Sequence, residues 1–218
     1  MQNNMSSLTP LSSFYLSYVF IYLRPSQVEE ALLLLSKYRA ECKIICGGQS
    51  FLILMRQGLV VSEYLMDIKF LKELNDIDYD PQRGLRIGAG TSHRAIERLE
   101  VIRERFRVLG EMESKLTSIQ TCNGGTFGGN ICHGDPASDP AAVLISLNAS
   151  LKMVNSNRER SMAVEDFFST ILRQPWMRMR CYWRFKGLDL LHGQPEPLKS
   201  STLLKMIWPL YRWLPPSH

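Results

Sequence analysis

Short apolar runs alternate with amphipathic segments along most of the chain. Runs bounded by glycine or charged residues predict strands at residues 43–46, 63–68, 84–90 and 151–154. Apolar residues at helical spacing predict helices at residues 27–38, 51–56, 92–104, 140–147 and 164–170. This alternation indicates an α/β or α+β fold, of which we take α+β, with two lobes that divide near Gly58.

Polar residues at the predicted helix starts support these assignments. Ser26 with Glu29 three residues later has the form of a capping box, so we expect the first helix to begin there and to end near Tyr38. Ser92 is expected to cap the helix that follows it. The glycine-rich stretch at residues 124–130 is expected to be a loop.

The aromatic and aliphatic stretch at residues 8–23 is expected to be a buried strand or an ordered arm. Polar Thr9, Ser12, Ser13 and Ser17 interrupt it, and no Lys or Arg precedes it. The stretch is also short for a membrane span. We therefore expect no membrane association.

The positive charge is confined to one part of the chain. The net charge is +5, yet residues 1–170 hold 18 Lys and Arg against 19 Asp and Glu. The basic excess therefore lies in the last 48 residues, which also hold all four tryptophans. Charge placed in this way does not indicate a nucleic-acid surface, and we expect no nucleic-acid partner.

The five cysteines do not form a metal or disulfide pattern. They are scattered, and none stands in a C-x-x-C pair, as zinc and iron–sulfur sites commonly require. We expect no metal in this chain, free thiols, and a cytoplasmic location.

A pair of glycines stands between a predicted strand and a predicted helix. Glycine allows a tight turn and a close approach of the backbone to a ligand, and the N–H groups exposed there favour phosphate oxygens. A plain tight turn is the alternative interpretation. The candidate binding residues of this first segment are Ile44, Ile45, Cys46, Gly47, Gly48, Gln49, Ser50 and Phe51.

A second glycine-rich segment begins near Gly124 and runs into a polar stretch ending at Asp139. Such a segment loses much chain entropy when it becomes ordered, and a bound pyrophosphate would offset that loss. It has neither the Gly-Lys-Ser/Thr of a P-loop nor the spacing of a Rossmann fingerprint. Its candidate binding residues are Thr126, Phe127, Gly128, Gly129, Asn130 and Asp139.

Taken together, the motifs resemble the FAD-binding subunit of molybdenum hydroxylases of the xanthine dehydrogenase and carbon monoxide dehydrogenase type. The resemblance covers about residues 18–170, and the segments that carry it are Tyr22–Ala31, Cys46–Ser50, Tyr64–Ile68, Leu85–Ala89, Gly125–Cys132 and Asp135–Asp139. It implies a two-lobed FAD-binding fold of the molybdopterin dehydrogenase or vanillyl-alcohol-oxidase-like type.

The resemblance also implies a role for the cofactor and its partners. Both glycine segments would hold the FAD pyrophosphate between the lobes, Asp139 would bond the ribityl–phosphate part, and Leu116 would lie near the flavin. FAD would accept electrons from an iron–sulfur small subunit and pass them to NAD or another acceptor, beside a molybdenum-cofactor large subunit. No catalytic side chain is expected in this chain.

The resemblance ends near Gln174, and a frameshift near Arg173 is our hypothesis for the tail. Residues 176–180 can be encoded by the codons TGG ATG AGG ATG AGG, which a shifted frame would read as Asp-Glu-Asp-Glu. The residues that follow then permit Val-Leu-Leu-Glu-Ile, and the family has a similar motif there. A divergent natural tail is the alternative, and DNA sequencing separates the two.

These considerations divide the chain into four parts. Residues 1–17 are expected to be an extension, 18–58 the first FAD-binding lobe, 59–173 the second lobe, and 174–218 a tail outside the family, with the C-terminal domain missing. Two other functions remain open: a truncated remnant that does not retain FAD, and a stand-alone FAD oxidoreductase.

Overall fold

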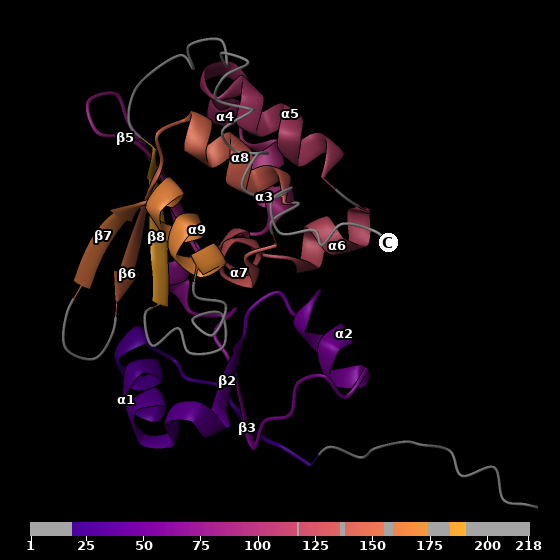
Figure 1. Ribbon diagram of the computed structural model, residues 1–218. Helices are drawn as coiled ribbons and strands as arrows, with labels where there is room; N and C mark the ends of the chain where they lie inside the picture. The colour runs from indigo at the N-terminus through magenta and orange to yellow at the C-terminus, as the bar shows by residue number, and fades with distance from the viewer. Residues whose placement is uncertain (1–18, 117, 136–137, 155–158, 174–183, 191–218) are drawn as a thin grey trace, which may run out of the picture.

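The chain folds into two lobes, one above the other in Figure 1. The computed structural model describes residues 19–116, 118–135, 138–154, 159–173 and 184–190, the last of these and 169–173 as backbone only. Within these ranges, no helix is both long enough and apolar enough to cross a membrane.

The first lobe is a three-stranded parallel sheet, ordered β1-β3-β2, with helices beside it. Apolar side chains from the central strand and α1, among them Met66 and Ala31, form its core. Its elements are β1 (Ile21–Leu23), α1 (Val28–Tyr38), a 3-10 turn (Arg39–Glu41), β2 (Cys42–Ile45), α2 (Phe51–Arg56) and β3 (Tyr64–Asp67).

The lobes do not divide at Gly58. Strand β3 follows that glycine in sequence, yet it pairs with both β1 and β2 and is the middle strand of the first sheet. A second 3-10 turn, Lys72–Leu74, then leads to the first strand of the other sheet, β4 (Ile77–Asp80). The change of lobe therefore lies between residues 68 and 77.

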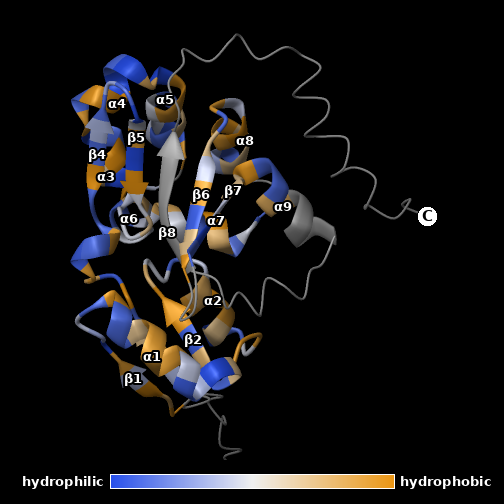
Figure 2. Cartoon of the chain, turned by 90° about the vertical axis from the view of Figure 1, so that its left-hand side faces the viewer, coloured by the Kyte–Doolittle hydropathy of each residue, from blue (hydrophilic) through white to orange (hydrophobic). Residues whose placement is uncertain are grey.

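The second lobe is a five-stranded sheet, ordered β4-β5-β8-β6-β7, covered by helices. Strand β5 contributes buried Leu85 and Ile87 to its core, and the hydrophobic positions of the strands are visible in Figure 2. The other elements are β5 (Gly84–Gly88), α3 (His93–Arg98), α4 (Glu100–Arg105), α5 (Arg107–Lys115), α6 (Ile119–Gly124), α7 (Phe127–His133), α8 (Asp139–Ser146), β6 (Ser150–Val154), β7 (Glu159–Ala163), α9 (Val164–Arg173) and β8 (Arg184–Leu190).

The single helix expected over residues 92–104 is two helices. Leu99 has extended backbone angles, φ −70° and ψ 129°, between α3 and α4. Ile96 and Ile102 are both fully buried, although six residues apart on one helix they would point about 120° apart around its axis. The break at Leu99 lets both side chains enter one core. Ser92 caps α3 as expected, its Oγ accepting from the Ala95 N–H at 3.2 Å.

Two other local expectations differ from the structure. The capping box expected from Ser26 and Glu29 does not form: Gln27 precedes α1, and the N–H and the hydroxyl of Ser26 both donate to the Glu30 carboxylate, at 2.7 and 2.9 Å. The stretch at residues 124–130 is mostly helical rather than a loop. Thr126 caps α7 by accepting from the Gly129 N–H at 3.3 Å, and this bond fixes the first turn despite the glycines.

Part of the predicted tail belongs to the sheet. Strand β8 comes from residues 184–190 and pairs antiparallel with both β5 and β6. The rest of the tail, the N-terminal extension and part of the stretch at 8–23 lie outside the described residues. The frameshift and the boundary at residue 173 stay predictions.

Candidate functional site

The two glycine segments are in direct backbone contact where the lobes meet. A Cβ atom on Gly47 would lie 2.7 Å from the Gly124 carbonyl oxygen and 2.8 Å from the Thr126 nitrogen. Neither atom can rotate away, since both belong to the backbone. Gly47 and the segment around Gly124 and Gly125 therefore approach closely because the first has no side chain.

Three side chains join the lobes around this contact. The Lys69 Nζ donates to the Gly124 carbonyl at 3.4 Å. The Cys46 thiol shares a hydrogen bond with the Thr126 side chain. Gln49 donates to the Gly47 carbonyl at 3.1 Å and lies directly against Gly124. The lobes are thus held together at the end of β2 by polar contacts.

Burial keeps the Cys46 thiol neutral. Removal from water raises its pKa, the hydrogen bond with Thr126 opposes that shift, and the charges of Asp67 and Lys69 act in opposite directions. A protonated thiol places no negative charge beside the glycine segments. That favours an anionic ligand at this point.

The first segment offers donors that the protein itself does not use. In the described ranges, the backbone N–H groups of residues 47–51 have no acceptor. Gly48 has a positive φ of 71°, which lets the successive N–H groups curve around one point. Gln49 and Ser50 are exposed beside them. Such a curve of free donors is typical of phosphate binding.

Most backbone N–H groups of the second segment already donate to other groups of the protein. The N–H groups of Phe127 and Gly128 donate to the carbonyls of Thr91 and Ala89, each at 2.9 Å. The N–H of Asn130 donates to the Thr126 carbonyl at 3.0 Å. Over residues 125–130, which the structure describes, Thr126 alone has an N–H without an acceptor. This segment is held rigidly and has few backbone donors left for a ligand.

The other predicted binding residues differ in their surroundings. Phe127 is fully buried in the core of the second lobe, whereas Gly129 is exposed. Asn130 is half-buried, and its Oδ1 accepts from the Ser138 hydroxyl at 2.7 Å. Asp139 is exposed at the first position of α8. Four predicted residues with apolar side chains are half-buried: Ile44, Ile45, Phe51 and Leu116.

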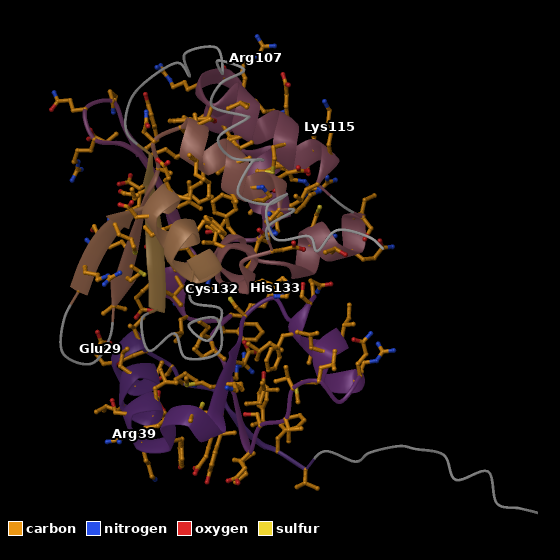
Figure 3. All side chains as sticks on the ribbon, in the orientation of Figure 1. Glu29, Arg39, Arg107, Lys115, Cys132 and His133 are labelled. Carbon is orange, nitrogen blue, oxygen red and sulfur yellow. The ribbon has the colours of Figure 1, made fainter. Side chains whose placement is uncertain are left out.

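Several residues near this contact were not among the predicted ones. Lys69 follows β3, whose end lies beside the end of β2, and the parallel pairing of the strands could have indicated its place. The Thr91 hydroxyl is buried and has no partner in the described part of the chain. His93 and Glu113 form a buried pair behind the second segment. Figure 3 shows Cys132 and His133, at the end of α7, beside the first lobe.

The fold and the site define a class of protein: two lobes that meet at a glycine turn with unused backbone N–H groups on one side and a hydrogen-bonded glycine segment on the other. The chain belongs to the family of the FAD binding domain in molybdopterin dehydrogenase, whose sequence profile matches residues 15–178. The predicted family, the α+β fold, FAD as cofactor and the class of FAD-dependent oxidoreductase subunit are confirmed.

Similar proteins include subunits of dehydrogenases. The chain is 31% identical over 199 residues to caffeine dehydrogenase subunit beta of a Pseudomonas species, covering 85% of this chain and 67% of that protein. It is 31% identical over 149 residues to the carbon monoxide dehydrogenase medium chain of Hydrogenophaga pseudoflava, a match that covers 68% of this chain and 52% of that protein. A solved structure of carbon monoxide dehydrogenase from that organism, which lacks the Mo-pyranopterin moiety of the molybdenum cofactor, is also similar. It matches with a TM-score of 0.73 and 26% identity, and the match covers 81% of this chain and 60% of that chain.

The chain spans between 52% and 67% of the length of these two curated relatives. The match to caffeine dehydrogenase subunit beta covers more of the chain than residues 1–173 would provide, so it extends into the predicted tail.

Proposed function

We propose that this chain is an electron-transfer subunit that holds FAD between its lobes and works beside a molybdenum-cofactor subunit and an iron–sulfur subunit. The observation that supports this most is the run of free backbone N–H groups at residues 47–51, which lies against the second glycine segment. Electrons would enter from the iron–sulfur partner and leave to NAD or another acceptor.

The residues present fit a pyrophosphate group. The donors at residues 47–51 would bind its oxygens, with Gln49 and Ser50 adding side-chain donors. Lys69 would supply a positive charge, and neutral Cys46 removes a competing negative one. When bound, FAD supplies the redox chemistry, and the task of the chain is to orient it and exclude water from it.

The second segment would fix the position of the cofactor by its shape. Its backbone is already hydrogen-bonded to the segment at residues 89–93, so it need not be ordered by the ligand. The Thr126 N–H and the side chains of Asn130 and Asp139 are the groups with which it would reach FAD.

The proposed partners and location rest on the relatives and on the cysteines. Similar proteins are named as medium chains or lettered subunits, which implies an assembly of several chains. The five cysteines are scattered along the chain and none stands in a C-x-x-C pair, a usage that a reducing compartment favours. We therefore include a cytoplasmic location in the proposal.

Titration of the purified chain with FAD, FMN and riboflavin tests the binding function. We expect quenching of flavin fluorescence and a shifted visible spectrum with FAD, and much weaker binding of riboflavin, because the site is built around phosphate. Equal affinity for FAD and riboflavin would contradict the proposal. A colourless protein would favour a remnant that does not retain the cofactor.

Co-purification tests the assembly. A chain that comes with a molybdenum-containing partner supports the electron-transfer role, whereas a flavin-loaded chain that oxidises a substrate alone would favour a stand-alone oxidoreductase.

A further inference from the structure

A buried His–Glu pair lies behind the second glycine segment. His93 is the first residue of α3 and Glu113 lies in α5, whose ends are marked by Arg107 and Lys115 in Figure 3. The His93 Nδ1 is 2.9 Å from one Glu113 carboxylate oxygen and 3.2 Å from the other. The two side chains are 4% and 0% exposed. Contact with both oxygens fixes the rotation of the imidazole ring.

The other side of His93 contacts the glycine segment. Its backbone N–H donates to the Gly125 carbonyl at 3.4 Å, and its ring meets the Phe127 ring edge-on, with centroids 5.9 Å apart. A Cβ on Gly125 would stand 3.4 Å from the His93 Cδ2 atom, so the imidazole packs against the glycine backbone. The neighbouring residue, Ser92, forms a β-bridge with Thr126.

The glycine segment depends on this support because few of its own residues carry side chains. Its N–H groups at Phe127 and Gly128 donate to the turn at residues 89–91, which leads to His93. That stretch is tied to α5 through Glu113. A chain of contacts thus runs from α5 through the imidazole to the glycine backbone.

We propose that His93 and Glu113 are positioning residues that hold the second glycine segment in the conformation that receives the FAD pyrophosphate, an inference that rests on the proposed function. The desolvation of a buried pair opposes its attraction, so its net contribution to folding is small. Its contribution is a fixed ring orientation. Burial also raises the pKa of the Glu113 carboxyl, against the opposing effect of its bond with His93.

Hydrogen exchange in the FAD-free protein, followed by FAD titration, tests this role. Replacing Glu113 by Leu removes the acceptor, and loss of a charged buried hydrogen bond should speed exchange of the Phe127 and Gly128 amides about tenfold or more. The dissociation constant for FAD should rise by a similar factor. Glu113→Gln keeps an acceptor oxygen and should stay within about threefold of the wild type.

Two further comparisons separate positioning from general destabilisation. Leu151→Ala truncates a fully buried side chain in β6, outside the glycine segment, and should leave both readouts unchanged once its lower stability is allowed for. His93→Asn keeps an N–H donor near Nδ1, whereas His93→Leu does not, so this pair repeats the test if Glu113→Leu does not fold.

The proposal is overturned if Glu113→Leu, or His93→Leu where that variant replaces it, leaves both readouts unchanged. It is equally overturned if Leu151→Ala raises them as much. Because exchange is measured without cofactor, a wild-type chain that binds no FAD would defeat the proposed function, while the exchange data would still decide whether the pair holds the segment.

Discussion

Replacing Gly47 by alanine should separate the lobes at the site. The new methyl group would meet three backbone atoms, the Gly124 oxygen and the Gly125 Cα at 2.7 Å and the Thr126 nitrogen at 2.8 Å. Ordinary contacts of this kind begin near 3.4 Å, so the segments must move apart by more than half an ångström. Overpacking of this size costs about 1–3 kcal/mol. If the cost falls on the closed arrangement, FAD affinity falls about five- to 150-fold.

The assay is FAD titration by fluorescence, with urea unfolding as a second readout. Gly110→Ala is the matched control, because its methyl group, inside α5, would lie 3.5 Å from the Ile102 Cγ2 atom of α4, an ordinary contact. That variant should bind FAD as the wild type does and should be more stable by up to about 1 kcal/mol, since alanine favours a helix over glycine. A Gly47→Ala chain with wild-type affinity and stability would refute the packing argument.

Four other outcomes are expected. Thr126→Ala should lose about 1 kcal/mol of stability in urea unfolding, because the cap of α7 is removed, whereas Thr126→Ser should lose little. Lys69→Met should weaken FAD binding and reduce its sensitivity to salt, measured by titration at two ionic strengths, and an unchanged salt dependence would count against a charge contact. Burial raises the pKa of the Glu113 carboxyl above its ordinary value of 4.5, so the folded state holds that proton to higher pH than the unfolded state, and the stability from this group falls as pH rises through that window; Glu113→Gln should flatten this part of the pH dependence of stability, measured by urea unfolding. Sequencing of the gene across residues 173–185 should show codons compatible with a shifted frame, and incompatible codons would dismiss the frameshift.

Local features of the fold were predictable because their signals lie within a few residues. The second helix has the expected bounds, Phe51–Arg56, since a glycine pair and a serine precede its apolar run. The cap at Ser92 was likewise predicted from its own sequence neighbourhood. The glycine-rich stretch was mistaken for a loop because helix propensity counts each glycine against a helix. In the structure, the Thr126 cap and the bonds to residues 89–91 outweigh that penalty.

Contacts between distant parts of the chain were not predictable in this way. The residues around Gly47 in the sequence do not indicate that Gly124 will lie against it. Those around His93 do not indicate its contact with Glu113, twenty residues later. The break at Leu99 depends on burying two isoleucines in a core that the rest of the lobe creates. These features arise from tertiary packing, which overrides local propensity.

Gly47 and Gly48 of the first segment are required for different physical reasons, and the two segments differ in how they use their N–H groups. Gly47 is needed because another backbone lies against it, whereas Gly48 is needed for a positive φ that turns free N–H groups toward one point. The second segment donates two of its N–H groups to residues 89 and 91, uses most of the others in its own turns, and packs against His93. In the proposed function, the first lobe would therefore supply most of the phosphate donors, and the second would supply a rigid wall. It follows that FAD affinity should respond to changes near Gly48 through lost hydrogen bonds, and to changes near His93 through lost order in the segment before the ligand arrives.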